Sequence, residues 1–315
     1  LVPQAGWPME TIAAGRGSPL SLRRPLNLPR FLLALAQSRN LIARWRPDAV
    51  VALGGFAAAA PGLAAAWRGV PLAVLEQNTI PGRVNRMLAR HARQVHLQFE
   101  EARPFVSACR GEVLHSGSPL RPEIAALARE APCRGPALLV MGGSQGAQNL
   151  NRIVCRAVGQ LPAMEIAVVH VAGASHEEAV RRSYAEAQVA AEVRGFHGDM
   201  VGLYRRARLV IGRAGATSIA EWWAAGLPAV LVPLPSARDD HQRANAASVR
   251  AGGGAVLLEE AGLTPEALAR TIGELWRDEP RREAMARAMR AMARPDAGGA
   301  IARKVLELAA KAERS

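Results

Sequence analysis

Short apolar runs bounded by glycine, proline or polar residues recur along the whole chain. They are rich in valine, leucine and alanine, and they occupy residues 49–53, 72–75, 95–99, 113–115, 137–141, 166–171, 209–211, 229–233 and 255–258. Between several of these runs the apolar positions follow helical spacing, as over 83–93, 148–158 and 241–250. Continuous apolar runs are typical of strands buried on both faces, and strands that alternate with helices favour parallel sheets covered by helices. The pattern therefore predicts an α/β fold.

The runs fall into two groups, which predicts two Rossmann-like domains. A proline-containing segment over 120–136 separates the groups and is expected to be a linker. We place the first domain at 1–119 and the second at 137–294, and we expect a C-terminal helix over 295–315 to return to the first domain. The stretch 1–30 has no opening strand with a glycine-rich turn, so the chain is expected to begin part-way through a domain.

The chain is strongly basic, with 40 Lys and Arg residues against 27 Asp and Glu residues and a net charge of +13. This balance favours nucleic acid, anionic lipid or a phosphorylated substrate as a partner. We expect no nucleic-acid partner, because the sequence has no helix-turn-helix, zinc-finger or RNP motif. Three cysteines without CxxC spacing predict neither a disulfide framework nor a zinc site. The longest uncharged stretch, 49–67, is broken by glycines and a proline and is not a predicted membrane span.

The segment 209–221 carries the strongest chemical signal. Its apolar run leads into Gly212 and Gly215, and two hydroxyl side chains and the carboxylate of Glu221 follow. This order predicts a buried strand, a glycine turn and a helix N-terminus, whose N–H groups favour an anion. A nucleotide fits there, with its diphosphate at the helix start and its ribose hydroxyls on Glu221. The alternative is a structural turn with a solvated glutamate.

A second glycine turn covers 142–146, between the apolar run at 137–141 and a helical stretch. Its glycines permit close approach of a ligand to the backbone, and Ser144 can donate to phosphate or sugar oxygens. The turn has neither the GxGxxG pattern of nicotinamide-binding domains nor the P-loop signature. An ordinary Rossmann turn is the alternative.

Polar residues also follow the runs at 72–75 and 229–233, at the strand ends where open parallel sheets bind ligands. After the first run, Glu76, Gln77 and Asn78 are expected to face a cleft. The alternative for Asn78 is that it caps the next helix.

After the run at 229–233, Asp239 or Asp240 is expected to cap a helix, from whose first turns His241, Gln242 and Asn245 project. Amide side chains in this position suit sugar hydroxyls. A metal site at these aspartates is disfavoured, because no second group of ligands has matching spacing.

Taken in order, these segments resemble the MurG family of peptidoglycan glycosyltransferases, whose members move N-acetylglucosamine (GlcNAc) from UDP-GlcNAc onto lipid I to form lipid II. The matching motifs run through almost the whole chain, at 54–56, 76–78, 117–121, 142–147, 195–200, 213–221 and 240–245. Each motif is weak by itself, but together and in the family's order they are specific.

The resemblance implies the glycosyltransferase B architecture, two Rossmann-like domains that face each other across a cleft. It implies an inverting hexosyltransferase of peptidoglycan synthesis, and hence a part in cell-wall biogenesis, cell shape and cell division. It implies no cofactor, since UDP-GlcNAc is the donor substrate. The implied partners are UDP-GlcNAc, undecaprenyl-linked lipid I and the cytoplasmic face of the bacterial cell membrane, where the enzyme would be peripheral. A UDP-GlcNAc epimerase-like enzyme is the alternative activity.

By matched position, the UDP-GlcNAc site would consist of Asn78, Arg121, Ser144, His197, Ala216, Thr217, Ser218, Ile219, Ala220, Glu221 and Gln242. The resemblance places the ribose hydroxyls on Glu221 and the GlcNAc hydroxyls on Gln242. Ser144 would serve the diphosphate and the sugar, and Arg121 would stabilise the departing diphosphate. The family usually has an aliphatic residue at position 197, whose backbone reads the uracil, and a Leu-Thr pair at 217–218.

The family's N-terminal Gly-Gly-Thr-Gly-Gly-His loop, thought to bind the acceptor diphosphate and to supply a catalytic histidine, has no counterpart here. We expect a truncated form of a longer enzyme rather than a non-catalytic donor-binding remnant, and we assign no general base. The lipid acceptor suggests a membrane contact, and the apolar stretch 26–35 with its neighbouring arginines predicts a membrane-surface patch. A buried helix face explains the same leucines equally well.

Overall fold

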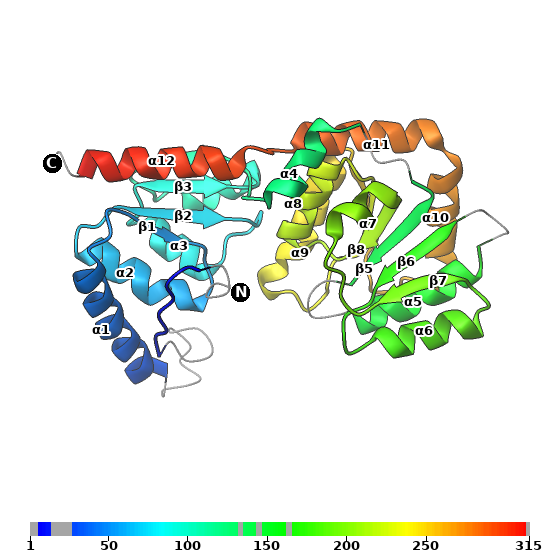
Figure 1. The fold of residues 1–315 in the computed structure, drawn as a ribbon, viewed down its shortest axis with the longest axis horizontal. Coiled ribbons are helices and arrows are strands. Elements are labelled where there is room, and N and C mark those ends of the chain that lie inside the picture. Colours follow the sequence, from blue (N-terminus) through cyan, green and yellow to red (C-terminus); the bar gives the residue numbers. More distant parts are fainter. Residues whose placement is uncertain (1–5, 14–26, 132–134, 143–146, 162–165, 313–315) are drawn as a thin grey trace. The chain divides into compact units, whose positions relative to one another are not determined.

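The structure, a computed structural model, describes residues 6–13, 27–131, 135–142, 147–161 and 166–312. It divides into two compact units. The first unit comprises Leu1–Glu76, Pro81–Ser116 and Gly299–Ser315, and the second comprises Gln77–Ile80 and Gly117–Gly298. Each unit is an α/β structure with a parallel sheet (Figure 1).

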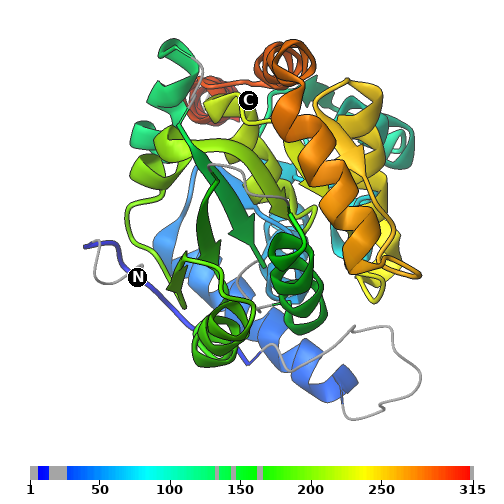
Figure 2. The ribbon, with the colours of Figure 1, turned by 90° about the vertical axis from the view of Figure 1, so that its right-hand side faces the viewer.

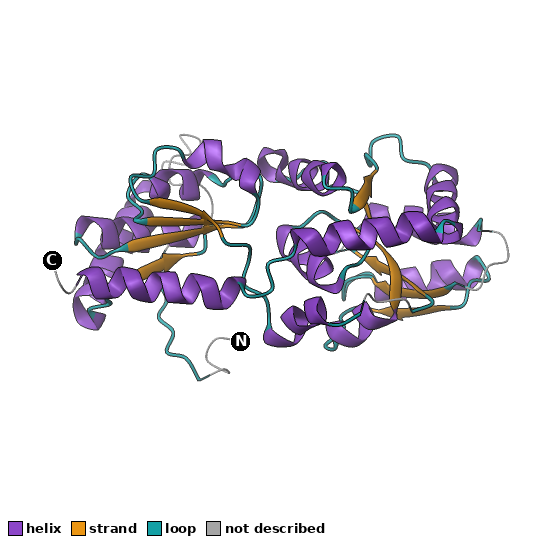
Figure 3. Ribbon diagram, turned by 90° about the horizontal axis from the view of Figure 1, so that it is seen from above, coloured by secondary structure: helices purple, strands orange, loops and turns teal. Residues whose placement is uncertain are grey.

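The first unit contains a four-stranded parallel sheet in the order β1-β2-β3-β4, with helices on both sides (Figure 3). Its elements are α1 (Asn27–Trp45), β1 (Val50–Ala52), α2 (Ala59–Trp67), β2 (Leu72–Glu76), α3 (Arg83–Ala89), β3 (Gln94–Leu97), β4 (Glu112–His115) and, from Gly299 on, α12 (Ala297–Ala312). All five residues of β2 are buried, as the uninterrupted apolar run at 72–75 predicts for a strand that is covered on both faces.

The second unit contains a six-stranded parallel sheet in the order β10-β9-β8-β5-β6-β7, and Figure 2, in which this unit faces the viewer, shows helices on either side of the strands. Its strands are β5 (Ala137–Met141), β6 (Ala167–Val171), β7 (Ala191–Arg194), β8 (Ala207–Gly212), β9 (Ala229–Leu231) and β10 (Ala255–Leu257). Its helices are α4 (Pro122–Ala126), α5 (Gln148–Gly159), α6 (Glu177–Glu186), α7 (Met200–Arg206), α8 (Ala216–Ala225), α9 (His241–Ala251), α10 (Pro265–Arg277) and α11 (Glu279–Met292).

Every apolar run that was expected to be a strand forms one, but the sequence pattern missed β7 (Ala191–Arg194). This strand lies at the edge of the second sheet and pairs only with β6 in the described part of the chain. Of its four residues only Val193 is fully buried. An edge strand that is half exposed does not need an apolar run, so periodicity gave no signal for it.

The segment 120–136, expected to be a linker, belongs instead to the second unit where it is described. Pro122 begins α4, in the first turn, where the missing N–H of proline costs no helical bond. Ile124 and Leu127 are 0% and 1% exposed, and Arg290 of α11 donates to two carbonyl oxygens of the segment. Because its apolar side chains are buried, this segment is folded structure and not a free connection.

The chain reverses its progress across the second sheet between β5 and β8. From β5 it moves outward through β6 to β7, and it then returns to β8 on the other side of β5 and continues through β9 to β10. Open parallel sheets bind ligands where the strand order reverses in this way, beyond the carboxyl ends of the strands. The fold therefore directs attention to the ends of β5 and β8.

Candidate functional site

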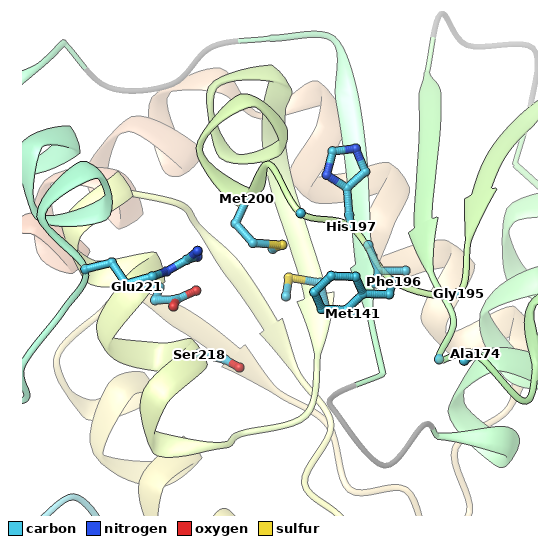
Figure 4. A pocket seen from close by; sticks show the side chains of 12 residues that line it. Met141, Ala174, Gly195, Phe196, His197, Met200, Ser218 and Glu221 are labelled. Atoms are coloured by element: carbon cyan, nitrogen blue, oxygen red, sulfur yellow. The ribbon is translucent and has the colours of Figure 1, made fainter. Parts of the chain in front are cut away.

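A pocket of about 510 Å³ opens in the second unit beyond the ends of β5, β6 and β7 and beside α8, a volume that suits a small-molecule ligand (Figure 4). Its walls are formed by Arg121, Met141, Val171, residues 173–174 and 195–198, Met200, Ser218 and Glu221. In Figure 4 the side chains of Met141, Phe196 and Met200 lie on one side, and those of Ser218 and Glu221, from α8, lie on the other. The pocket thus has an apolar wall opposite a helix that carries polar side chains.

The N-terminal end of α8 supplies backbone donors beside this pocket. The helix begins at Ala216 behind the N-cap Gly215, and its first backbone bond runs from the Ile219 N–H to the Gly215 carbonyl (3.0 Å). Like every helix N-terminus, this end of α8 carries the positive pole of the helix dipole, which favours an anion. At the end of β8, Gly212 is required by packing, because a Cβ there would lie 2.7 Å from the Met141 carbonyl oxygen.

Glu221, one and a half turns into α8, is partly buried and hydrogen-bonded rather than freely solvated. The hydroxyl of Tyr204, on α7, donates to Glu221 Oε2. Tyr204 is fully buried, at 0% exposure. Burial, and then the charge of Glu221, raise the pKa of the Tyr204 hydroxyl well above its ordinary value. The hydroxyl therefore remains a donor and holds the carboxylate in place.

A buried ion pair fixes the turn that leads into α8. Arg213 is 7% exposed, and its Nη1 donates to the carbonyl oxygens of Val232 and Pro233 (3.1 Å each) and to the carboxylate of Glu260. Burial pushes the pKa of Glu260 upward, but hydrogen bonds from Arg213 and then Asn149 outweigh it and hold that pKa below its usual value. The charged pair joins the end of β8 to the segments that follow β9 and β10.

Asn245, on α9, fixes the same turn from another side. It is 0% exposed, its Oδ1 accepts from both the N–H and the hydroxyl of Thr79 (2.9 Å each), and its Nδ2 donates to Asn78 Oδ1 and to the Ala214 carbonyl (3.1 Å each). These contacts use all four hydrogen-bonding positions of the amide. They hold the segment 77–80, which groups with the second unit, against the residue before Gly215.

The structure departs from several local interpretations of the sequence. Asn78 does not cap α3, which begins several residues later behind the N-cap Gly82. Asn245 does not project towards a ligand, because its hydrogen bonds are satisfied inside the protein. Asp240 occupies the N-cap position of α9, as expected for one of the two aspartates, but with a φ of 54° it makes no side-chain capping bond there. Glu76 also turns inward: it is 3% exposed and accepts from the Gly82 N–H (3.2 Å).

The structure brings four of the expected site residues together at the pocket: Arg121, His197, Ser218 and Glu221. Ile219 and Ala220 pack into the core at 0% and 5% exposure, so only their backbone could meet a ligand. The other expected residues, Asn78, Ala216, Thr217 and Gln242, do not line this pocket, and the Gln242 Oε1 accepts from the Leu234 N–H (3.0 Å). Ser144 lies outside the described residues.

Sequence reasoning missed the apolar side of the pocket. Met141, Phe196 and Met200 line it, and Phe196 is 82% exposed. The position of Met141 at the end of the first strand of its sheet was a usable signal, because ligands meet that edge. Within the described residues, no three His, Cys, Asp or Glu side chains are grouped so that they could hold a metal ion.

Comparison with known proteins shows which family this chain resembles. Residues 137–299 match the glycosyltransferase family 28 C-terminal domain, and residues 1–97 match the glycosyltransferase family 28 N-terminal domain. The chain is 41% identical to the UDP-N-acetylglucosamine–N-acetylmuramyl-(pentapeptide) pyrophosphoryl-undecaprenol N-acetylglucosamine transferase of Stutzerimonas stutzeri, over 98% of this chain and 87% of that protein. It is 40% identical to the protein of the same name from Methylococcus capsulatus, over 98% of this chain and 86% of that protein.

Solved structures agree with this assignment. The crystal structure of Acinetobacter baumannii MurG has a TM-score of 0.79 and 30% identity, and the match covers 97% of this chain and 86% of that chain. A UDP-GlcNAc 2-epimerase from Neisseria meningitidis, bound to UDP-GlcNAc, has a TM-score of 0.66 at 12% identity over 97% of this chain and 87% of that chain, a likeness of fold alone. The expected fold, two α/β domains with parallel sheets, is confirmed, and the chain belongs to the MurG family of glycosyltransferase family 28.

Proposed function

We propose that this chain transfers GlcNAc from UDP-GlcNAc to lipid I and so forms lipid II, the reaction that its relatives' names describe. The observation that carries the proposal is the pocket at the β5/β8 switch point, where Glu221 and the N-terminal end of α8 lie together. A nucleoside diphosphate sugar needs both an anion site and an acceptor for its ribose hydroxyls, and α8 offers both on adjacent turns.

We assign the parts of the donor as follows. The diphosphate lies at the start of α8, beside Ser218, and the ribose hydroxyls donate to the Glu221 carboxylate. The uracil lies along residues 195–198, after β7, with His197 among them. Arg121 also lines this pocket. Its side chain is exposed, with Nη1 3.6 Å from Glu123 Oε1, and it can turn towards the diphosphate.

In the proposed reaction the acceptor hydroxyl attacks the anomeric carbon of GlcNAc from the side opposite the diphosphate. The new carbon–oxygen bond forms as the bond to the diphosphate breaks, UDP leaves, and the configuration inverts. Negative charge grows on the departing diphosphate, and the α8 dipole and Arg121 stabilise it. The hydroxyl proton passes to a general base that we leave unassigned, and we propose no cofactor for the reaction.

Replacing Glu221 with glutamine is expected to weaken UDP-GlcNAc binding by about 10- to 100-fold, because a hydrogen bond to a charged group contributes roughly 1.5–3 kcal/mol. Isothermal titration calorimetry measures the dissociation constant. Glu178→Gln, on α6 with its side chain 91% exposed, is the matched control and should bind as the parent does. An E221Q affinity within twofold of the parent would show that the ribose is placed wrongly.

A UDP-GlcNAc epimerase would also bind this donor, but it would release a free epimerised sugar without any lipid. Incubation with radiolabelled UDP-GlcNAc, with and without lipid I, separates the two activities. We expect label in a lipid product only when lipid I is present. A free labelled sugar that forms without lipid I would favour the epimerase, and no turnover in either case would favour a donor-binding remnant.

We further propose that α1, in the first unit, binds the anionic cytoplasmic surface of the membrane as a peripheral contact. Leu28, Leu32 and Leu33 are 57%, 55% and 51% exposed, and Arg39 is exposed further along the helix. Leu35, in contrast, is buried with α2, so the stretch 26–35 combines a core face with an exposed apolar one where it is described. Exposed leucines beside arginines suit a lipid interface. No helix in the described part of the chain is long and apolar enough to cross a bilayer.

Replacing Leu32 and Leu33 together with glutamate is expected to weaken binding to vesicles of phosphatidylglycerol and phosphatidylcholine by about tenfold or more, because apolar area is lost and negative charge is added. Vesicle co-sedimentation measures the partition. Leu306→Glu, on α12 and 69% exposed, is the matched control and should leave binding nearly unchanged. Equal losses in both variants would mean that α1 is not the contact.

A further inference from the structure

Tyr204 stands out among the polar groups of the second unit because it is buried far more deeply than the pocket residue that it touches. It is 0% exposed, whereas Glu221 lines the pocket. Burying a hydroxyl is costly unless it is hydrogen-bonded, and the Tyr204 hydroxyl donates to Oε2 of the Glu221 carboxylate. Among the described residues, Tyr204 alone donates to that carboxylate.

The helix that carries Tyr204 also carries part of the opposite wall of the pocket. Met200 begins α7 and lines the pocket, and residues 195–198, just ahead of it, line it as well. The start of α7 is fixed by Asp199, whose side chain accepts from the Gly202 N–H (2.8 Å). Leu203, next to Tyr204, is 2% exposed and anchors the helix in the core. Tyr204 therefore links α7 to α8 from a buried position outside the lining of the pocket.

We infer that Tyr204 is a positioning residue that sets the affinity for the ribose of a nucleoside diphosphate, by holding one oxygen of the Glu221 carboxylate so that the other meets the ribose hydroxyls. The inference rests on the proposed placement of the ribose on Glu221. Because burial raises the pKa of the Tyr204 hydroxyl well above its ordinary value, the hydroxyl keeps its proton at neutral pH and donates to Glu221. It does not itself touch the donor, since the side chain is shielded from the pocket.

The test compares two ligands that differ only in the hydroxyls at issue. Binding of UDP and of 2′,3′-dideoxyuridine diphosphate, which lacks both ribose hydroxyls, is measured calorimetrically for the parent, Tyr204→Phe, Glu221→Gln and the double variant. We expect Y204F to weaken UDP about five- to tenfold and to leave the dideoxy ligand within twofold of the parent. Because the hydroxyl acts only through Glu221, the double variant should bind UDP no more weakly than E221Q alone.

Tyr184→Phe is the matched control, since Tyr184 is a second buried tyrosine of the same unit (2% exposed) whose hydroxyl meets His170 and does not line the pocket. Y184F should bind both ligands as the parent does. An equal loss of both ligands in Y204F, as a merely structural role would give, overturns the inference, and so does unchanged UDP binding in Y204F beside a defect in E221Q. Unchanged UDP binding in E221Q instead overturns the ribose placement itself, and the inference falls with it.

Discussion

Replacing Arg213 with methionine is expected to lower the free energy of unfolding of the second unit by about 3–5 kcal/mol, the cost of breaking a buried ion pair from one side. Methionine fills a similar volume but cannot donate. The Glu260 carboxylate, whose side chain is 9% exposed, would remain buried without its cation. The carbonyl oxygens of Val232 and Pro233 would also lose their donor. Urea unfolding measures the loss, and hydrogen exchange in β8 assigns it to this unit.

Two further variants make this prediction specific. Replacing both partners, as Arg213→Met with Glu260→Met, should recover a large part of the loss, because no uncompensated charge remains buried. Arg243→Met breaks a neighbouring pair, Arg243 Nε to Glu259 Oε1 at 2.7 Å, whose side chains are 59% and 49% exposed. Since exposed pairs contribute little, this loss should be much smaller. Similar losses for R213M and R243M would contradict the argument.

Replacing His170 with glutamine is expected to flatten the loss of stability that the parent shows in acid. His170 is 0% exposed, and burial lowers the pKa of its imidazole to about 3. Its Nε2 faces Asn151 Oδ1 (3.1 Å) and its Nδ1 faces the Tyr184 hydroxyl (3.0 Å). An imidazole that is neutral, with its proton on Nε2, satisfies both contacts, because it donates to Asn151 and accepts from Tyr184.

In the unfolded chain the same imidazole titrates near its ordinary value of 6.5. Between that value and about 3 the unfolded state therefore binds a proton that the folded state does not, so stability falls as the pH drops through this range. At about 1.4 kcal/mol per pH unit, the parent should lose roughly 2 kcal/mol from this group by pH 5. Urea titrations at pH 7 and pH 5 measure the difference for each protein. Equal losses in the parent and H170Q would contradict the prediction, whatever their stabilities at pH 7.

The sequence predicted most of the fold because a parallel strand that is buried on both faces appears in the sequence as an uninterrupted apolar run. The runs at 72–75 and 137–141 are apolar throughout, and β2 and β5 form there. A strand that is only partly buried, such as β7, has no such run. Prolines misled the interpretation of 120–136, since Pro122 begins a helix instead of ending structure and the apolar side chains around it pack into the second unit.

The candidate site likewise has a part that the sequence predicted and a part that it could not predict. The glycine turn at 212–215 and the carboxylate of Glu221 could be predicted from the sequence, because the strand, the turn and the helix start are consecutive in the chain. The hydrogen-bond donor to that carboxylate could not be predicted, since Tyr204 lies on the preceding helix and contacts Glu221 only when α7 and α8 pack together. Asn245 was expected to face a ligand, but its amide is buried against a segment more than a hundred residues away in the sequence.

By itself the sequence determined the strand–helix alternation, the division into two α/β units, the glycine turn before α8 and the family to which these motifs belong. All of these are encoded by residues that are neighbours along the chain, through periodicity, turn chemistry and the order of motifs. Only the tertiary structure decided which polar side chains face the pocket and which, like Asn245 and Arg213, are buried and hydrogen-bonded inside the protein. The physical reason is that a buried polar group must find its hydrogen-bond partner wherever packing places one, and packing joins residues that the sequence keeps apart.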